Sequence, residues 1–381
     1  MKVILTIFLT VQVITFAFSQ QYPVFGPEKQ VEITGLTFDA MEPFITADGN
    51  TLFFNSLNSG GNTNLYFATR VNDTVFNYQG PLAGCTDSSP NHLDAVASAD
   101  ENGKFYWVSL RNYPNVFENL HCGIYSSGIV SDTSRVYGDF NITSLGWLIM
   151  DASITSQGDQ LIYCNSYFDF INNSCGTGVP CSSKLGIAEK TNDTTFFKLL
   201  NSDQIFSEVN DTSYLVYAPQ VTADGLELYY TRLQKGTVNT EICVSVRSNI
   251  NDDFSAPAVI YSYYGYVPEA PSPSSDKQKL YYHRKNNSGI FRIFMRYRTG
   301  TTIAESKSCD PGYSFRIKDS SIHLSYKSGK HFTVILESLS GKYIFSAENP
   351  GIIDVSHLTK GVYLLSFCDE RGRHSEKIVI E

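Results

Sequence analysis

The sequence predicts an all-β chain, a five-bladed β-propeller followed by a small C-terminal β-sandwich. Three observations lead to this fold class. A hairpin motif occurs five times between Glu42 and Ser275, no helical pattern separates the copies, and the repeat stops near residue 300. Units of three or four strands that repeat without helical crossovers close most easily into a ring of radial sheets.

The repeated motif is clearest in EPFITADGNTLFFNS, where Asp48-Gly49 separates two apolar runs. Asp-Gly between such runs is a strong hairpin signal, because both central residues of a type I′ turn need φ > 0. We take Glu42 as the register mark, six residues before the turn. The same step finds four more copies: DAVASAD from Asp94, DASITSQ from Asp151, APQVTAD from Ala218 and EAPSPSS from Glu269.

The ends of the repeat region suggest how the ring closes. Val31 to Leu36 precedes the first copy without a partner of its own, and the last copy, Glu269 to Arg298, has only three strands. An early strand that completes the last blade would explain both observations and remove an exposed edge. We therefore expect Val31–Leu36 to pair with the last blade.

The best copies also resemble a known repeat. EPFITADGNTLFFNS with NLYFATR, and APQVTADGLELYYTR with EICVSVR, are similar to the PD40 or TolB-type "WD40-like" propeller repeat, whose core reads acidic-Pro-x-x-S-x-D-G-x-x-aromatic. Copies two, three and five have lost the Asp-Gly pair or the proline. The resemblance covers roughly residues 28 to 299 and implies a fold, since propellers host unrelated functions.

The N-terminus predicts export. Met1 to Ser19 has Lys2, a short apolar run and Ala17-Phe18-Ser19 at its end, which is the pattern of a secretory signal peptide with the mature chain starting at Gln20. A membrane anchor is the alternative, and the short run interrupted by Gln12 argues against it. No later segment is apolar enough to span a bilayer. The net charge of −9 and the pI near 5.3 argue against nucleic acid as a partner.

An exported chain with eight cysteines can form disulfides. Cys175 and Cys181 lie in a Gly/Pro-rich insertion and are the first candidate pair. Two further pairs are considered because each lies within one neighbourhood: Cys85 with Cys122, and Cys309 with Cys368. Cys164 and Cys243 lie inside apolar runs and are expected to be buried thiols. No Cys-x-x-Cys pair occurs, so a cysteine-bound metal is not expected.

The register position supplies the candidate chemistry. It carries Glu42, Asp94, Asp151 and Glu269, with Ala218 in the fourth copy. In a propeller, the first strands line the central channel, so these acids should meet at one mouth. Three interpretations stay open: the acids bond backbone amides of adjacent blades, they bind a ligand or a cation such as Ca²⁺, or two of them act as acid and base or nucleophile.

Other residues add less. His92 precedes Asp94 by two residues and would face the same mouth. Tyr264 and Tyr266 in YSYYGYVP could present rings to a sugar or a peptide, and so could Trp107 and Trp147. Packing between blades explains these aromatics equally well. The chain has no Gly-x-Ser-x-Gly, His-Glu-x-x-His or Walker-type motif, so enzyme activity is not the favoured interpretation.

After Thr301 the composition changes to short alternating strands with turns, which predicts a β-sandwich of about 70 residues. The runs VILESLSGKYIF, IIDVSHLTKGVYLLSF and GRHSEKIVIE resemble the C-terminal sorting domain of the type IX secretion system. The usual Pro-Asn-Pro is absent, and Cys309-Asp310-Pro311-Gly312 stands in its place. An ordinary carbohydrate-binding or adhesion sandwich is the alternative.

Together these patterns predict a signal peptide (1–19), a PD40-like propeller (20–300) and a sorting domain (301–381). The expected function is binding of a glycan, peptide or protein by an exported bacterial protein at the cell surface or in the medium. The alternative is a glycoside hydrolase. The expected partner of the sorting domain is the type IX secretion machinery, no cofactor is expected, and Ca²⁺ is the one metal that the acids would suit.

Overall fold

A computed structural model of the chain describes residues 21–58, 62–86, 92–176, 178–263, 265–303, 313–318, 320–326, 331–338, 343–369 and 372–380. The predicted signal peptide, Tyr264 and Cys309 lie outside these residues. The described part is all-β, with one four-residue helix, α1 (Ser202–Ile205). Within it, no helix has the length and hydropathy needed to cross a membrane.

Residues 21–303 form five antiparallel sheets, to which one short parallel pair is added. The first sheet contains β2 (Glu32–Thr34), β6 (Val75–Pro81), β5 (Leu65–Asn72), β4 (Thr51–Asn55) and β3 (Met41–Ile45) in that order. The second contains β10 (Ile129–Arg135), β9 (Leu120–Ser126), β8 (Lys104–Ser109) and β7 (Asp94–Ala99). The third contains β11 (Trp147–Ile154), β12 (Gln160–Tyr167), β13 (Ser182–Asn192) and β14 (Thr195–Lys198).

The fourth and fifth sheets complete this part, which we call the five-sheet region. The fourth contains β15 (Tyr214–Val221), β16 (Glu227–Gln234), β17 (Thr240–Val246) and β18 (Ala258–Ser262). The fifth contains β1 (Gln21–Gln30), β21 (Phe291–Ile303), β20 (Lys279–Lys285) and β19 (Glu269–Pro273).

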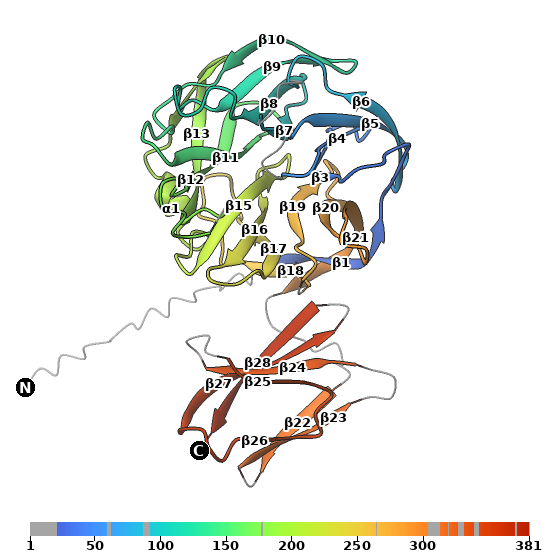
Figure 1. Cartoon of the computed structure of the whole chain (residues 1–381), viewed down its shortest axis with the longest axis vertical. Helices are drawn as coiled ribbons and strands as arrows, with labels where there is room; N and C mark the ends of the chain where they lie inside the picture. The colour runs from blue at the N-terminus through green and yellow to red at the C-terminus, as the bar shows by residue number, and fades with distance from the viewer. Residues whose placement is uncertain are drawn as a thin grey trace, which may run out of the picture.

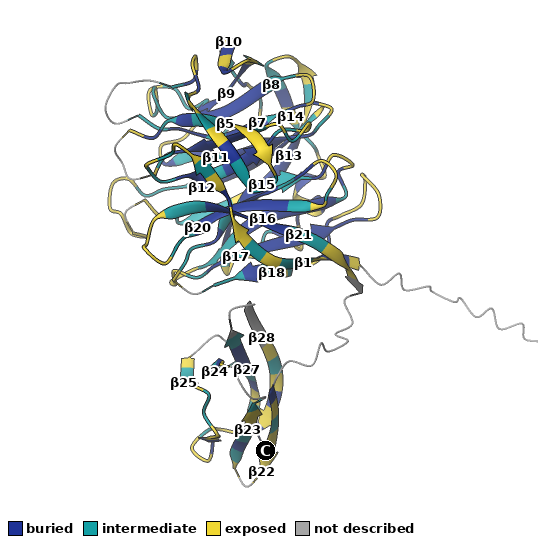
Figure 2. Ribbon diagram, turned by 90° about the vertical axis from the view of Figure 1, so that its right-hand side faces the viewer, coloured by how far each residue is buried: buried dark blue, intermediate teal, exposed yellow. Residues whose placement is uncertain are grey.

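The five sheets are arranged around a common centre (Figure 1). Their first strands contact one another in cyclic order, β3 with β7, β7 with β11, β11 with β15, β15 with β19 and β19 with β3. Side chains tether neighbouring first strands: the amide of Ile45 donates to Ser272 Oγ (3.1 Å) and that of Ile154 to Ser98 Oγ (3.0 Å). The inner strands are largely buried and the outer connections exposed (Figure 2).

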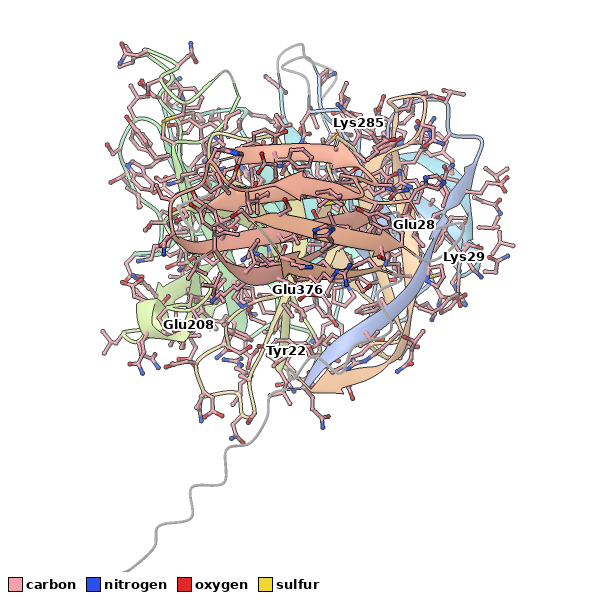
Figure 3. All side chains as sticks on the ribbon, turned by 90° about the horizontal axis from the view of Figure 1, so that it is seen from below. Tyr22, Glu28, Lys29, Glu208, Lys285 and Glu376 are labelled. Atoms are coloured by element: carbon pink, nitrogen blue, oxygen red, sulfur yellow. A yellow bond between two sulfur atoms is a disulfide. The ribbon has the colours of Figure 1, made fainter. Side chains whose placement is uncertain are left out.

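An N-terminal strand completes the fifth sheet, as the three-stranded last copy predicted, but the segment differs. It is β1 that pairs with β21, whereas β2, inside the predicted Val31–Leu36 segment, pairs in parallel with β6 of the first sheet. Tyr22 and Glu28 on β1 (Figure 3) make its side-chain contacts. Tyr22 Oη donates to the carbonyl of Ala256 (2.8 Å), and Glu28 forms an ion pair with Arg284.

Aromatic and aliphatic side chains fill the space between neighbouring sheets. Four cysteines are buried in these apolar clusters. Cys85 is buried with Phe53 and Phe105, while Cys122 is buried in the cluster of Tyr106 and Phe196. The predicted Cys85–Cys122 pairing is therefore wrong, because the two thiols lie in different cores. Cys164 and Cys243 are buried thiols in one apolar cluster.

The C-terminal residues form two more sheets with one shared core. One sheet contains β22 (Tyr313–Lys318), β23 (Ser321–Tyr326) and β26 (Ile352–Asp354). The other contains β25 (Tyr343–Glu348), β24 (Thr333–Ser338), β27 (Gly361–Asp369) and β28 (Gly372–Ile380). Ile322 and Ile353 of the first sheet pack in one cluster with Val334, Leu336 and Leu365 of the second.

Candidate functional site

The turns at the ends of the first strands define which residues are equivalent in the five sheets. In each sheet one backbone N–H closes the turn by donating to the carbonyl at the start of the second strand; the donors are Thr46, Asp100, Thr155, Thr222 and Ser274. Counting four residues back gives the structural register position. It is occupied by Glu42, Val96, Asp151, Ala218 and Ala270.

The predicted register is therefore wrong in two copies. Asp94 lies two residues before the register position, because Asp100, which the spacing matched with Asp48, is the turn donor equivalent to Thr46. Glu269 lies one residue before it, because Asp276 and not Ser275 takes the turn position of Asp48. The predicted ring of four equivalent carboxylates is thus a ring of two, with Glu269 one residue away.

A β-bulge at this position turns the side chains of the first strands. The pairing of β3, β7, β15 and β19 with their second strands skips two residues there, and that of β11 skips Met150, one residue before the register position. The bulged residues hold left-handed φ angles of 51° at Glu42, 57° at Val96, 49° at Ala218 and 52° at Ala270. Non-glycine residues adopt this conformation at an energetic cost, so the surrounding contacts must impose it.

Three carboxylates interact near the centre: Glu42, Asp151 and Glu269. Glu269 Oε1 accepts a hydrogen bond from Tyr217 Oη (2.5 Å), and its Oε2 lies 3.4 Å from His283 Nε2. The amide of Glu42 donates to His283 Nδ1 (3.0 Å). Because Nδ1 accepts, the proton of the neutral imidazole is on Nε2, facing Glu269. We call Glu42, Asp151, Glu269, Tyr217 and His283 the axial cluster.

The remaining bonds of the two register carboxylates are few. Glu42 Oε1 accepts from Asn58 Nδ2 (2.9 Å), and the amide of Ala218 on the next sheet hydrogen-bonds Asp151. This bond of Asp151 is of the kind expected for a structural role, in which the acid accepts from a backbone amide of the adjacent sheet. Glu42 Oε2 and Asp151 Oδ2 have no hydrogen-bond partner among the described residues.

Burial sets the protonation of this cluster. Burial and then the charges of Asp151 and Glu269 raise the pKa of Glu42 to about 8, although hydrogen bonds from Asn58 and Asn55 oppose the rise. Burial also raises the pKa of Asp151 to about 7, against the bond from Ala218. The pKa of Tyr217 lies well above its usual value, first because of burial and then because of the charge of Glu269. Tyr217 is therefore a hydrogen-bond donor at neutral pH.

The space between the register residues is small. A cavity of about 10 Å³ is lined by residues of all five sheets: Glu42, Pro43, Val96, Ala97, Asp151, Ala218, Pro219, Gln220, Ala270 and Pro271. This is about the volume of one water-sized sphere. A sugar ring does not fit there, since ligand pockets hold hundreds of cubic ångström.

Asp94 is buried in a separate setting. Its Oδ2 accepts from Arg111 Nε (3.1 Å) and Nη2 (2.6 Å), and Arg111 also donates to the carbonyl of Cys85. Burial raises the pKa of Asp94, and the Arg111 guanidinium opposes that rise. His92, two residues earlier, also lowers it through its charge. Asp94 is thus charge-compensated, unlike the axial carboxylates.

A second feature lies at the end of the sheets where the first strands begin. Loops after β8 and β12, together with the start of β11, bring six aromatic rings to one surface: Tyr113, Phe117, Trp147, Tyr167, Phe168 and Phe170. Tyr113 packs on Phe117 and on Phe170, Phe168 stacks on Phe170, and Trp147 packs on Tyr167. We call this set the aromatic loop surface.

Gly146 joins the two halves of this surface. Its amide donates to Tyr113 Oη (2.7 Å), and its carbonyl accepts from the amide of Phe168 (2.8 Å). A Cβ at Gly146 would lie 2.5 Å from the carbonyl oxygen of Phe168 and 2.6 Å from the Tyr167 ring, at a φ of +93°. Only glycine fits this close approach.

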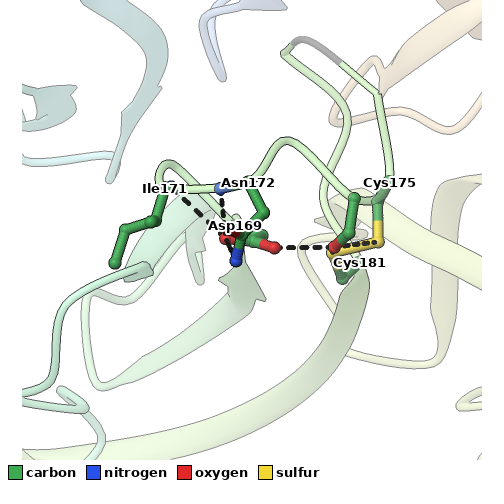
Figure 4. The surroundings of a disulfide bond; sticks show 6 residues. Asp169, Ile171, Asn172, Cys175 and Cys181 are labelled. Carbon is green, nitrogen blue, oxygen red and sulfur yellow. Dashed lines mark hydrogen bonds between the residues drawn. A yellow bond between two sulfur atoms is a disulfide. The ribbon is translucent and has the colours of Figure 1, made fainter.

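A disulfide closes the loop that carries Phe170 (Figure 4). The predicted pair Cys175–Cys181 is bonded in the structure. Asp169 organises the same loop: its carboxylate accepts from the amide of Asn172 (3.0 Å) and from Ser174 Oγ (2.7 Å). These bonds hold the pKa of Asp169 at about 2, first through Asn172. Phe170 and Ile171 stay 49% and 77% exposed.

The other predicted aromatic residues lie elsewhere. Tyr266 packs on Tyr263 and lines a cavity of about 800 Å³, whose wall also includes Phe332 and Tyr343. Trp107 is buried beside Phe105. Trp147 alone of these belongs to the aromatic loop surface. No group of three or more His, Cys, Asp and Glu side chains in the described ranges has the spacing of a metal site.

Sequence reasoning missed several members of both features. His283 and Tyr217 were not singled out, although each stands on a strand next to a register acid. Phe168 and Phe170 were overlooked inside YFDFINNSC, where aromatic residues in a disulfide-closed insertion were the available signal. These residues meet their partners only when neighbouring strands and sheets pack together in the fold.

Comparison with known families identifies the C-terminus. Residues 318–381 match the family described as "Secretion system C-terminal sorting domain". The predicted resemblance is therefore confirmed for this part of the chain. The chain carries a sorting domain for the type IX secretion machinery, which directs it to secretion followed by surface attachment or release.

No curated protein matches the sequence. Among solved structures, a family 117 glycoside hydrolase from Zobellia galactanivorans is 9% identical over 72% of this chain and 90% of its own, with a TM-score of 0.46. An endo-arabinase from Bacteroides thetaiotaomicron is 13% identical over 70% and 96%, with a TM-score of 0.43. TolB from Acinetobacter baumannii is 13% identical over 69% and 55%, with a TM-score of 0.37. Likenesses this low say nothing about activity.

Proposed function

We propose that the chain is an exported five-bladed β-propeller of the PD40 type that binds a glycan on its aromatic loop surface. The propeller would span residues 20–300 and the sorting domain residues 301–381, with a signal peptide at 1–19. The cyclic contacts of the first strands and the closing strand β1 support a ring of five blades. The matched sorting domain supports delivery to the cell surface or the medium.

The observation that carries the proposal is the exposure of rings on a braced loop. Phe170 is about half exposed while Phe168 and Tyr113 hold it from both sides. Folding gains little from leaving such side chains in water, and clustered exposed apolar residues mark interaction sites. The disulfide and the bonds of Asp169 keep the loop ordered before a ligand arrives, which reduces the entropic cost of binding.

A glycan suits this surface better than a peptide does. Aromatic rings offer a flat apolar face, which matches the rows of C–H groups on one side of a pyranose ring. Tyr113 and Trp147 also carry a hydroxyl and an indole N–H at their edges, which can hydrogen-bond sugar hydroxyls. The rim residue Asp169 is ionised over the physiological pH range and accepts hydrogen bonds.

An oligosaccharide array and a peptide array with the purified full chain test this function. We expect binding to a limited set of oligosaccharides, lost in Phe170→Ala and kept in Asp151→Asn. Binding to peptides alone, or oligosaccharide binding that survives Phe170→Ala unchanged, would contradict the proposed ligand or the proposed surface.

A glycoside hydrolase is the second candidate, and the axial cluster is the observation that favours it. Glu42 and Asp151 have pKa values raised to about 8 and about 7, the range that a general acid needs. The cavity of about 10 Å³ argues against it, since the reacting sugar must lie between the carboxylates. Reducing-sugar release by the wild type, abolished in Glu42→Gln and Asp151→Asn, would establish the hydrolase.

A further inference from the structure

The axial cluster leaves two carboxylate oxygens without partners, and they belong to the two register acids. Glu269 is bonded by Tyr217 and faced by His283. Glu42 Oε2 and Asp151 Oδ2, in contrast, accept nothing from the described residues. Asp151 is only 3% exposed, so bulk water does not solvate its free oxygen. A buried carboxylate without a counter-charge is costly, so these acids must hold either a proton or a bound cation.

The cavity fixes the size of that occupant. Glu42 and Asp151 both line the cavity of about 10 Å³, which holds a single particle. A sugar or a peptide group is too large, an anion would be repelled, and a water molecule could bond the free oxygens but would not balance their charge. None of the described Lys and Arg residues forms an ion pair with Glu42, Asp151 or Glu269, and His283 is neutral through its bond from Glu42. The charge is therefore left for a small cation.

We propose that this cavity binds one Ca²⁺ ion on the axis, held by Glu42 and Asp151. Carboxylate oxygens are the ligands that this hard cation prefers, and two carboxylates match its charge. Because no three acidic, histidine or cysteine side chains of the described residues are placed to hold one metal ion together, neutral oxygens from the cavity wall would complete the shell. Gln220, whose Oε1 already accepts from Ser153 Oγ (3.0 Å), is a polar side chain of that wall.

The export route makes Ca²⁺ the suitable cation. Extracellular modules bind it with dissociation constants of roughly 0.1–1 mM, which suits a site with two carboxylates and a rigid frame. The sorting domain delivers this chain to such surroundings. An ion between β3 and β11 would join the first and third sheets across the axis, so its effect is on the unfolding temperature.

The test compares the full chain and two variants in EDTA and in CaCl₂ up to about 10 mM, a concentration well above such dissociation constants. We expect Ca²⁺ to raise the unfolding temperature of the wild type by several degrees, and elemental analysis after equilibrium dialysis against the CaCl₂ buffer to find one Ca²⁺ per chain above the buffer concentration. In Asp151→Asn the order inverts: this variant unfolds above the wild type in EDTA, because it loses an unpaired charge, and below it in Ca²⁺.

Asp48→Asn is the matched control, because Asp48 is an exposed turn carboxylate on the same first hairpin and should leave the Ca²⁺ response unchanged. If the wild type shows no Ca²⁺-dependent shift and no bound metal, the proposal is wrong. It is also wrong if Asp151→Asn keeps the full shift, or if only lowering the pH stabilises the wild type, since a proton would then be the occupant. Should Asp151→Asn fail to fold, Glu42→Gln provides the same comparison.

Discussion

Strand β11 connects two places with opposite physical character. Trp147, at its start, belongs to the aromatic loop surface and is half-buried, whereas Asp151 lies four residues further and is only 3% exposed. At roughly 3.3 Å per residue this separates them by about 13 Å. One end of the strand presents apolar rings to water, and the other holds charge away from it.

The surroundings of Asp151 and of Phe170 differ in a way that favours a structural role for the first and a binding role for the second. The interior places Asp151 on a cavity that holds only one small particle, which favours a structural role for its carboxylate. In the aromatic loop surface Phe170 is exposed, and a disulfide and a hydrogen-bonded turn order the loop that carries it. An acid that recurs with the repeat is therefore weaker evidence of a functional site than an exposed aromatic ring on an ordered insertion.

The largest expected effect sharpens the contrast among buried acids. Asp94 is fully buried and compensated by Arg111, so Arg111→Met leaves an uncompensated carboxylate in the core. We expect the free energy of unfolding at pH 7 to fall by about 3–5 kcal/mol. Urea denaturation measures this loss.

Lys184→Met provides the comparison on the surface, because Lys184 pairs with Asp203 with both side chains more than half exposed. Its expected cost is below about 1 kcal/mol. Equal costs for the two variants would mean that Asp94 finds another partner, and the distinction between compensated and uncompensated acids would fail.

The next effect concerns the strand that closes the last sheet. Burial raises the pKa of Glu28, but its bonds with Arg284 and Tyr282 outweigh that effect and leave the pKa below its usual value. We expect Glu28→Gln to cost about 1.5–3 kcal/mol at pH 7, as for hydrogen bonds to charged groups. Because the folded pKa is depressed, this stability is present above the usual glutamate pKa of about 4.3 and is lost as pH falls through the folded value.

Denaturation of the wild type and Glu28→Gln at neutral and acidic pH should therefore show two curves that converge in acid. Glu32→Gln, on the neighbouring exposed strand β2, is the control and should change stability by less than about 0.5 kcal/mol. If the difference in free energy of unfolding between the wild type and Glu28→Gln were the same at all pH values, the ion pair of Glu28 would not stabilise the pairing of β1.

The repeat and its turns made the fold predictable, and small irregularities made the register unpredictable. Asp48-Gly49 and Asp224-Gly225 identify two hairpins directly, because the glycines hold φ of +70° and +71°. In the second copy Asp100 takes the place of Thr46 and not of Asp48, so Asp94 lies two residues before the position that the spacing assigned to it. No local pattern reports such a difference, since it is set by pairing across the hairpin.

The residues of the axial cluster were predictable only where they belong to the repeated first strand. Glu42 and Asp151 follow from the repeat, but their partner groups come from other sheets, as His283 on β20 and Ala218 on β15 illustrate. The cavity is lined by residues of all five first strands, which no single copy of the repeat predicts. The aromatic loop surface joins loops from two sheets, which no spacing in the sequence brings together.

A smaller effect tests the exposed side of the comparison. Phe170→Ala removes a ring that is 49% exposed, so we expect the affinity for an oligosaccharide found on the array to fall at least about tenfold, while stability changes by less than about 1 kcal/mol. Phe197, 52% exposed on β14 of the same sheet, is a matched control, and Phe197→Ala should keep the affinity. Equal losses in both variants would mean that binding is unspecific adhesion to exposed rings.

The smallest effect separates the order of the loop from the rings it carries. The Cys175–Cys181 bond closes a short loop, so removing it costs at most about 2.5 kcal/mol by the chain-entropy estimate, and less where Asp169 already orders the loop. In Cys175→Ser with Cys181→Ser all six rings remain, but Phe170 is no longer held in place before binding. We therefore expect a few-fold loss of oligosaccharide affinity, seen by calorimetry as a more unfavourable binding entropy, with the unfolding temperature lowered by no more than several degrees. An affinity equal to that of the wild type would show that the ring pairs alone position Phe170, and a loss as large as that of Phe170→Ala would place the disulfide itself in the binding surface.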